Sequence, residues 1–178
     1  MEKYRFNVHD FMEETYMVQV AKGIWVGNQE DAEYGWKRKQ EWAFVHACKE
    51  PWHRQFVGYT GNGAPKDNPE YYFAIRENEI ALNMVDVDNP EWFDKNMIKV
   101  AIGFIAKYSS SVNVLIHCNQ GQSRSPSLAL LYLAIVGEIP NQTFEEAEKA
   151  FVKIYPLYNP RQGIKLHLKK NWEEYIGK

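Results

Sequence analysis

The chain alternates short apolar runs with polar turns and with stretches whose apolar residues recur at helical spacing. Runs rich in β-branched and aromatic residues predict strands, because such side chains pack well on a pleated sheet surface. The runs are Thr15–Val20, Gly23–Val26, Trp42–Ala47, Ile80–Val85 and the run that ends at Cys118. The pattern therefore predicts about five strands.

Helical spacing appears between these strands. Polar residues 27–32 lead into a helix that we expect to end near Lys39. A second helix is predicted from Asn89, a good N-cap followed by a proline, to about Tyr108. Residues 128–136 are apolar almost all round, which indicates a helix buried on every side.

Two further helices are predicted near the C-terminus. Thr143, with Glu146 three residues later, forms a capping-box pattern that opens a helix to about Ile154. Asn159 is expected to cap a last helix that carries apolar residues as far as Ile176. Strands and helices in this order are typical of an α/β domain with a central, mostly parallel sheet flanked by helices.

One stretch does not fit this alternation. Residues 50–78 contain three prolines and three glycines among aromatic residues, without clear periodicity. A short helix around Pro69–Ile75 is compatible with the pattern. Because long irregular segments in compact domains are often functional, we expect this loop-rich insertion to form a wall of a substrate cleft.

Composition narrows the class of protein. A chain of 178 residues with 45% hydrophobic and 15% aromatic residues predicts a single domain over residues 1–178 with a sizeable core. The net charge of −2 gives no overall attraction to nucleic acid, so we do not expect a nucleic-acid partner. No uncharged apolar run approaches the ~18 residues of a membrane span, so no membrane partner is expected. The two cysteines imply no disulfide framework, and a reducing, cytoplasmic location is the default expectation.

The chemistry is concentrated in residues 112–125. An apolar run ends at Cys118, and Arg124 follows after five residues, immediately before a helix-like stretch. A strand that feeds a tight loop at a helix N-terminus makes an anion site, because unpaired amides and the helix dipole both favour negative charge. The same field favours a thiolate at Cys118. Gly121 permits a backbone turn, and the planar fork of Arg124 matches two phosphoryl oxygens.

The string His117-Cys118, five residues, Arg124-Ser125 resembles the signature of cysteine-dependent protein tyrosine phosphatases. Ser125-Pro126-Ser127 is similar to the dual-specificity branch of that superfamily, as are residues 24–32 and the closing segment 159–168. The resemblance covers residues 23–49 and 79–176. It implies a protein tyrosine phosphatase-like fold and a phosphomonoester hydrolase that works through a cysteinyl-phosphate intermediate, without cofactor or metal.

The resemblance also implies roles for individual residues. Cys118 would attack phosphorus, Arg124 would bind the phosphoryl group, and Ser125 would hydrogen-bond the sulfur and help it leave. His117 would give structural support to the loop. The residues expected to bind phosphate are Asn119, Gln120, Gly121, Gln122, Ser123 and Arg124.

The general acid in such enzymes is an aspartate about thirty residues before the cysteine. Two candidates exist, Asp86 and Asp88. We prefer Asp86, because it directly follows the apolar strand, and keep Asp88 as the alternative.

The substrate expected from the resemblance is a phosphorylated protein carrying phosphotyrosine, and phosphoserine or phosphothreonine as well. Asn119, Gln120 and Gln122 are neutral, which argues against a polyanionic lipid head group. Other phosphate esters (a nucleotide, an RNA 5′ end or an inositol phosphate) remain as alternatives. So do a phospho-residue binding module without turnover and a thiolate enzyme of sulfur transfer or arsenate reduction.

The remaining candidate residues have simpler interpretations. Cys48 follows a buried strand and is expected to be an inert core thiol. His46, Cys48 and His53 could be imagined as metal ligands, but their spacing is not that of a zinc site.

Overall fold

The computed structural model describes residues 17–35 and 41–178. A six-stranded sheet runs through its centre in the order β1-β2-β6-β3-β5-β4. The inner pairs β2–β6, β6–β3 and β3–β5 are parallel, and the two outer pairs are antiparallel. The strands are β1 (Val18–Ala21), β2 (Ile24–Gly27), β3 (Trp42–His46), β4 (Phe73–Arg76), β5 (Glu79–Leu82) and β6 (Asn113–His117).

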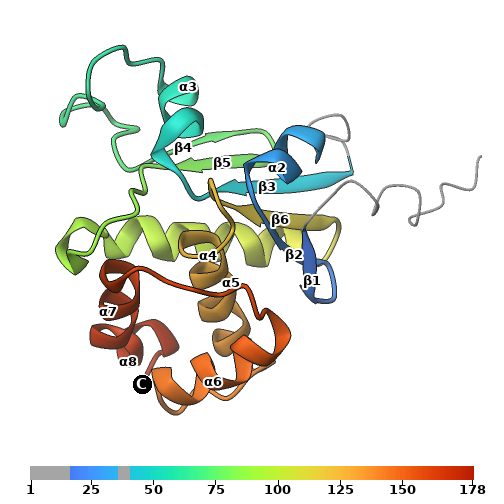
Figure 1. Ribbon diagram of the computed structural model, residues 1–178. Helices are drawn as coiled ribbons and strands as arrows, with labels where there is room; N and C mark the ends of the chain where they lie inside the picture. The colour runs from blue at the N-terminus through green and yellow to red at the C-terminus, as the bar shows by residue number, and fades with distance from the viewer. Residues whose placement is uncertain (1–16, 36–40) are drawn as a thin grey trace, which may run out of the picture.

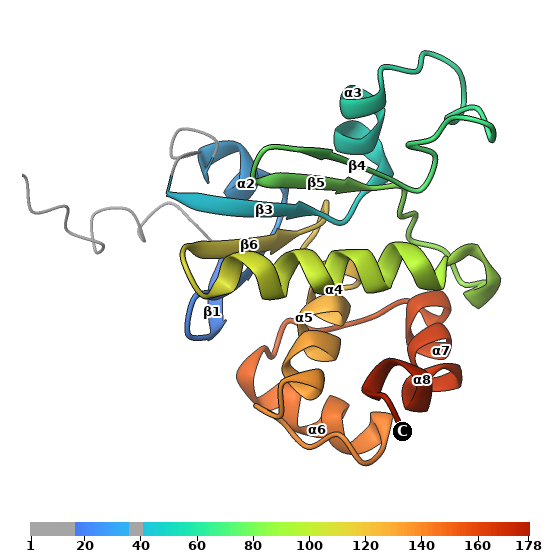
Figure 2. The same ribbon diagram turned by 180° about the vertical axis from the view of Figure 1, so that it is seen from behind.

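Helices cover both faces of this sheet (Figure 1). Helices α4 to α8 lie on one face, and the short helices α2 and α3 lie on the other, as the view from behind also shows (Figure 2). The helices are α2 (Gln29–Gly35), α3 (Arg54–Val57), α4 (Lys95–Ser109), α5 (Arg124–Ile135), α6 (Phe144–Ile154), α7 (Gln162–Lys170) and α8 (Trp172–Ile176). The predicted α/β class with a mostly parallel sheet is confirmed.

The main core fills the space between the sheet and helices α4 to α8. Helix α5 lies at its centre, and its side chains from Leu128 to Ala134 are buried, as predicted. The prediction of complete burial to residue 136 is wrong at the end of the helix, because Ile135 and Val136 are exposed. A smaller cluster around Trp42, Phe44 and Leu115 occupies the opposite face. Within the described residues no helix is both long and apolar enough to cross a membrane.

The predicted helix from Asn89 to Tyr108 is wrong as a single element. Asn89 does act as an N-cap, since its side chain accepts a hydrogen bond from Glu91 N, but it caps only the short turn η3 (Pro90–Trp92). Asp94 then caps α4 by accepting from Met97 N at 2.7 Å. An extended Phe93 separates the two, because its side chain is buried in the core.

The predicted short helix at 69–75 is also wrong. Phe73–Arg76 forms β4, which pairs antiparallel with β5 at the edge of the sheet, so the described sheet has six strands where five were predicted. A tight turn at Glu77, which has a positive φ of 50°, joins the two strands.

The predicted helix from Thr143 is confirmed. Thr143 Oγ1 accepts from Glu146 N at 3.2 Å, and α6 ends at Ile154. At the C-terminus, Arg161 rather than Asn159 is the N-cap, and the helical region is divided into α7 and α8 at Asn171. Residues 15–16 of the first predicted strand and 36–39 of the first predicted helix lie outside the described residues.

Candidate active site

Cys118 lies where the central strand β6 ends, and α5 begins six residues later. Its side chain is buried, and Ser125 Oγ donates a hydrogen bond to the sulfur at 3.2 Å. Ser125 is also within 3.3 Å of the Gly27 carbonyl oxygen, which ties the first turn of α5 to β2. The sequence therefore brings the candidate nucleophile and the candidate leaving-group partner into direct contact.

The loop between Cys118 and Arg124, here called the signature loop, is held from outside through its carbonyl groups. Asn119 O accepts from Gln29 N, Gly121 O accepts from the Tyr155 hydroxyl at 2.7 Å, and Gln122 O accepts from Asn159 N at 2.8 Å. In a trans peptide the carbonyl and the following N–H point in opposite directions. The N–H groups of residues 120, 122 and 123 therefore point away from these outside partners.

Gly121 is needed at the tightest point of this loop. Its φ is +71°, a conformation that L side chains rarely adopt, and an added Cβ would lie 2.8 Å from the Gly27 carbonyl oxygen. This close approach places the signature loop against β2.

Arg124 is almost completely buried, and its guanidinium is fixed at two points. Nη1 donates to Met84 O at 3.0 Å, and Nη2 donates to Asn119 Oδ1 at 2.7 Å. Within the described residues, buried Nε makes no hydrogen bond. An unsatisfied buried N–H is costly. The unpaired Nε–H is a donor that a bound anion can use.

Asp86 and Asp88 occupy different environments. Asp86 lines the pocket beside Cys118, and its Oδ1 accepts a hydrogen bond from Ser123 Oγ at 2.7 Å. The side chain of Asp88 is 66% exposed and accepts from Arg161 Nε and Nη2, each at 3.3 Å. The geometry therefore favours Asp86 over Asp88 as a group that could reach a bound ester.

The pocket has a volume of about 450 Å³, within the usual range for small-ligand sites. Its lining comprises residues 118–120 and 122–124 of the signature loop, together with Asp86, Asn159 and Arg161. None of these residues belongs to the insertion at 50–78, which was expected to form its wall. That insertion lines a neighbouring cavity instead.

A buried network of three side chains lies directly before the signature loop. It joins His46 at the end of β3, His117 at the end of β6 and Glu79 at the start of β5. His46 Nε2 lies 2.9 Å from Glu79 Oε2, and His46 Nδ1 lies 2.5 Å from His117 Nε2. Trp52 stacks on His46 with ring centroids 3.9 Å apart. Burial, followed by the neighbouring His46, lowers the pKa of His117 well below its usual value. His117 is therefore neutral and held in one orientation directly before the cysteine.

The sequence analysis did not predict this network of His46, Glu79 and His117, because the network depends on which strands pair in the sheet. Parallel pairing of β3 with β5 and β6 places His46 opposite His117, and Glu79 two residues from the position opposite His46. His53 does not join it, since its ring nitrogens contact Glu70 O and the Tyr59 hydroxyl. Among the residues that the structure describes, no three His, Cys, Asp or Glu side chains gather as metal ligands would.

The second thiol, Cys48, is fully buried and unbridged. Burial raises the pKa of the Cys48 thiol to about 12; Arg124 lowers it by a smaller amount, and Cys118 adds to the increase. A neutral, inert thiol is what this environment produces.

We compared the sequence and the fold with those of known proteins. No protein-family model matches the chain, and no curated protein matches its sequence. Solved structures do match. DUSP15 is 20% identical, with 90% of this chain and 92% of that chain covered and a TM-score of 0.57. Human DUSP28 is 15% identical, with 91% and 95% covered and a TM-score of 0.60. PTPMT1 in complex with PI(5)P is 18% identical, with 91% and 97% covered and a TM-score of 0.62.

The chain thus has the α/β fold of cysteine-dependent protein tyrosine phosphatases. More particularly, its fold is that of the dual-specificity branch, to which the signature at residues 117–125 also pointed.

Proposed function

We propose that the protein is a phosphomonoester hydrolase that acts on phosphorylated proteins through a cysteinyl-phosphate intermediate. One observation carries the proposal. Cys118, Arg124 and Asp86 line a single pocket, and Ser125 Oγ donates to the Cys118 sulfur. A nucleophile, a cationic clamp, an acid and a hydrogen-bond donor to the sulfur are together what phosphoryl transfer to a thiolate requires.

In the first step, the Cys118 thiolate attacks phosphorus while the bond from phosphorus to the ester oxygen breaks. The Arg124 guanidinium, whose Nε–H is unpaired, and backbone N–H groups of the signature loop stabilise the charge on the equatorial oxygens. Asp86 gives its proton to the departing oxygen, so the substrate leaves as a neutral alcohol or phenol.

In the second step, the Asp86 carboxylate accepts a proton from a water molecule, whose oxygen attacks phosphorus. The sulfur–phosphorus bond breaks, and inorganic phosphate and the Cys118 thiolate are released. The Ser125 hydroxyl stabilises the returning negative charge on sulfur through its 3.2 Å hydrogen bond. Neither of these two reaction steps needs a metal ion.

A phosphorylated protein is the substrate class that the pocket supports best. Its lining includes two cationic side chains, Arg124 and Arg161, and Arg161 is already engaged by Asp88 and by the Asp86 carbonyl. Asn119, Gln120 and Gln122 are neutral, so little charge remains for a second phosphate. One structural neighbour was solved with the phosphoinositide PI(5)P, so phosphoinositides are the second candidate substrate class.

The decisive experiment is hydrolysis of p-nitrophenyl phosphate in the presence of EDTA. We expect turnover by the wild type, none by Cys118→Ser, and a loss of about 10²-fold or more for Arg124→Lys, because lysine cannot form the bidentate contact. Turnover that survives Cys118→Ser would overturn the mechanism. A wild type that binds phosphopeptides without hydrolysing them would be a binding module.

A further inference from the structure

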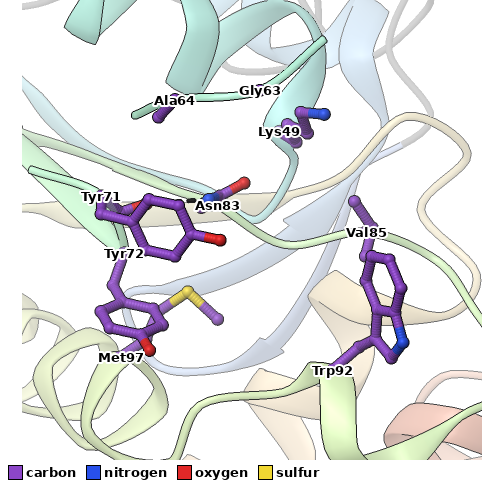
Figure 3. A pocket seen from close by; sticks show the side chains of 9 residues that line it. All are labelled: Lys49, Gly63, Ala64, Tyr71, Tyr72, Asn83, Val85, Trp92 and Met97. Carbon is purple, nitrogen blue, oxygen red and sulfur yellow. Dashed lines mark hydrogen bonds between the residues drawn. The ribbon is translucent and has the colours of Figure 1, made fainter. Parts of the chain in front are cut away.

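A second cavity lies beside the catalytic pocket and is built partly by the insertion at 50–78 (Figure 3). Its volume is about 140 Å³. In Figure 3, Tyr71, Tyr72 and Met97 lie on one side of it, and Val85 and Trp92 lie on the other, with Lys49 at its margin.

The cavity and the catalytic pocket share a wall. Val85 lines the cavity, and the next residue, Asp86, lines the catalytic pocket. Lys49 N and Arg124 Nη1 donate to the same carbonyl oxygen, that of Met84, at 2.8 and 3.0 Å. A substrate whose phosphate is bound by Arg124 therefore has neighbouring groups within reach of the cavity.

The size and lining of the cavity suit one aromatic ring. A cavity of about 150 Å³ is large enough for benzene, so this volume admits one ring. Tyr72 and Trp92, two of its lining side chains, are 46% and 65% exposed although both are large and apolar. Exposed aromatic side chains that flank a cavity are typical anchors for a partner, because a second ring can pack against them at low entropic cost.

The charge at the margin is positive. Glu50 Oε1 lies 4.0 Å from Lys49 Nζ, but both Glu50 oxygens accept from Arg54, each at 2.7 Å. These three side chains leave one net positive charge, and Lys49 Nζ is the one beside the cavity. Lys49 donates one of its three N–H bonds to Asn62 O. An acidic group of a ligand can bind the remaining donors.

The polar groups of the lining are poorly arranged to read a nucleobase. Asn83 Nδ2 already donates to Tyr71 O at 2.8 Å, and Asn83 N donates to Tyr72 O at 2.8 Å. Base recognition depends on hydrogen bonds to the base edge, whereas an aromatic side chain needs only packing. The lining therefore favours an amino-acid side chain over a base.

Resting on the proposed phosphatase function, we infer that this cavity binds an aromatic side chain that flanks the phosphorylated residue of a protein substrate. An acidic residue next to that aromatic residue contacts Lys49. The insertion at 50–78 thus selects the sequence around the phosphate, while the signature loop binds the phosphate itself.

The test measures phosphopeptide affinity for the Cys118→Ser protein, which binds without turnover. One peptide sequence carries phenylalanine at each flanking position in turn, against alanine in the same position. We expect one position at which phenylalanine strengthens binding roughly two- to tenfold, the usual gain of an aromatic pair. Tyr72→Ala and Trp92→Ala should abolish the preference. Leu166→Ala, which alters an exposed apolar side chain on α7, should leave it intact.

A glutamate placed beside the preferred phenylalanine should add a salt-dependent gain that Lys49→Met removes. Equal affinity for phenylalanine and alanine at every position would overturn the inference, as would a Tyr72-dependent preference among nucleoside monophosphates without one among peptides. Hydrolysis of p-nitrophenyl phosphate by the wild type tests the proposed function separately. Turnover without an aromatic preference refutes only the cavity's role, and a preference without turnover refutes only the hydrolase.

Discussion

Replacing Asp86 by asparagine should remove the general acid while leaving the pocket intact. The amide side chain would keep an oxygen that accepts from Ser123 Oγ, so the loop retains the hydrogen bond that now measures 2.7 Å. Loss of a general acid typically costs about 10²- to 10⁴-fold in rate, or roughly 3–5 kcal/mol at the transition state.

The matched change, Asp88→Asn, should cost far less. The ion pair of Asp88 with Arg161 joins two exposed side chains, and such pairs contribute about 0.2–1 kcal/mol. Even if the whole amount were lost from the transition state, the rate would fall at most about fivefold.

The assay compares pH–rate profiles of the two variants with two substrates. The p-nitrophenolate ion leaves readily without a proton, whereas the phenolate of phenyl phosphate or phosphotyrosine is strongly basic and needs one. Asp86→Asn should therefore lose more rate with phenyl phosphate than with p-nitrophenyl phosphate, and its profile should lose the basic limb. A basic limb that persists in Asp86→Asn but disappears in Asp88→Asn would refute the assignment.

Three further predictions concern the support of the site. Gly121→Ala should lower the free energy of unfolding by at least ~1–2 kcal/mol in urea titrations and abolish turnover, because a positive φ and the Gly27 carbonyl both oppose a Cβ; unchanged stability would refute the geometry. Intact-protein mass spectrometry after iodoacetamide treatment at pH 7 should show one adduct, which Cys118→Ser removes, because burial raises the pKa of Cys48 to about 12; a second adduct would show that Cys48 is accessible. The pKa of His117 is lowered by burial, so the unfolded chain binds a proton near pH 6.5 that the folded chain does not. The free energy of unfolding should therefore fall as the pH drops below about 6.5, by up to ~1.4 kcal/mol per pH unit for this residue. Urea titrations that give the same free energy of unfolding at pH 7 and at pH 5.5 would contradict this.

The signature loop was predictable because everything it needs is contiguous. Cys118, Gly121, Arg124 and Ser125 lie within eight residues, and the strand and helix on either side follow from local periodicity. A short loop between two fixed elements has few possible conformations. Its spacing therefore predicted the strand and the helix on either side, which the structure confirms, whereas the chemistry stays a prediction.

The predicted helix boundaries were wrong where two capping residues lie close together in the sequence. Asn89 and Asp94 are both good N-caps, and apolar spacing continues across them, so the sequence reads as one helix. Burial of Phe93 decides between them, and burial is a tertiary property. For the same reason, Phe73–Arg76 becomes a strand only because β5 lies beside it.

The buried network from Glu79 through His46 to His117 could not be predicted from spacing. Glu79 and His117 lie 33 and 71 positions after His46 in the sequence, and only the order of strands in the sheet brings the three together. From the sequence, His46 was considered as a metal ligand together with Cys48 and His53, and their spacing argued against it. Its neighbours in the structure are Glu79, His117 and the ring of Trp52.

The position of the candidate acid is set by a segment that carries none of the reacting groups. Arg161 Nη1 donates to Asp86 O at 2.9 Å, and Arg161 N donates to Ser123 Oγ, which itself donates to Asp86 Oδ1. Ser123 thus accepts from Arg161 and donates to Asp86, so it connects the signature loop, the segment that carries Asp86 and the start of α7. Gly163 lets α7 pack directly against the Val87 carbonyl, a contact that any Cβ would prevent. The start of the closing segment at 159–168 therefore fixes the position of Asp86 beside the signature loop, through Arg161 and Ser123.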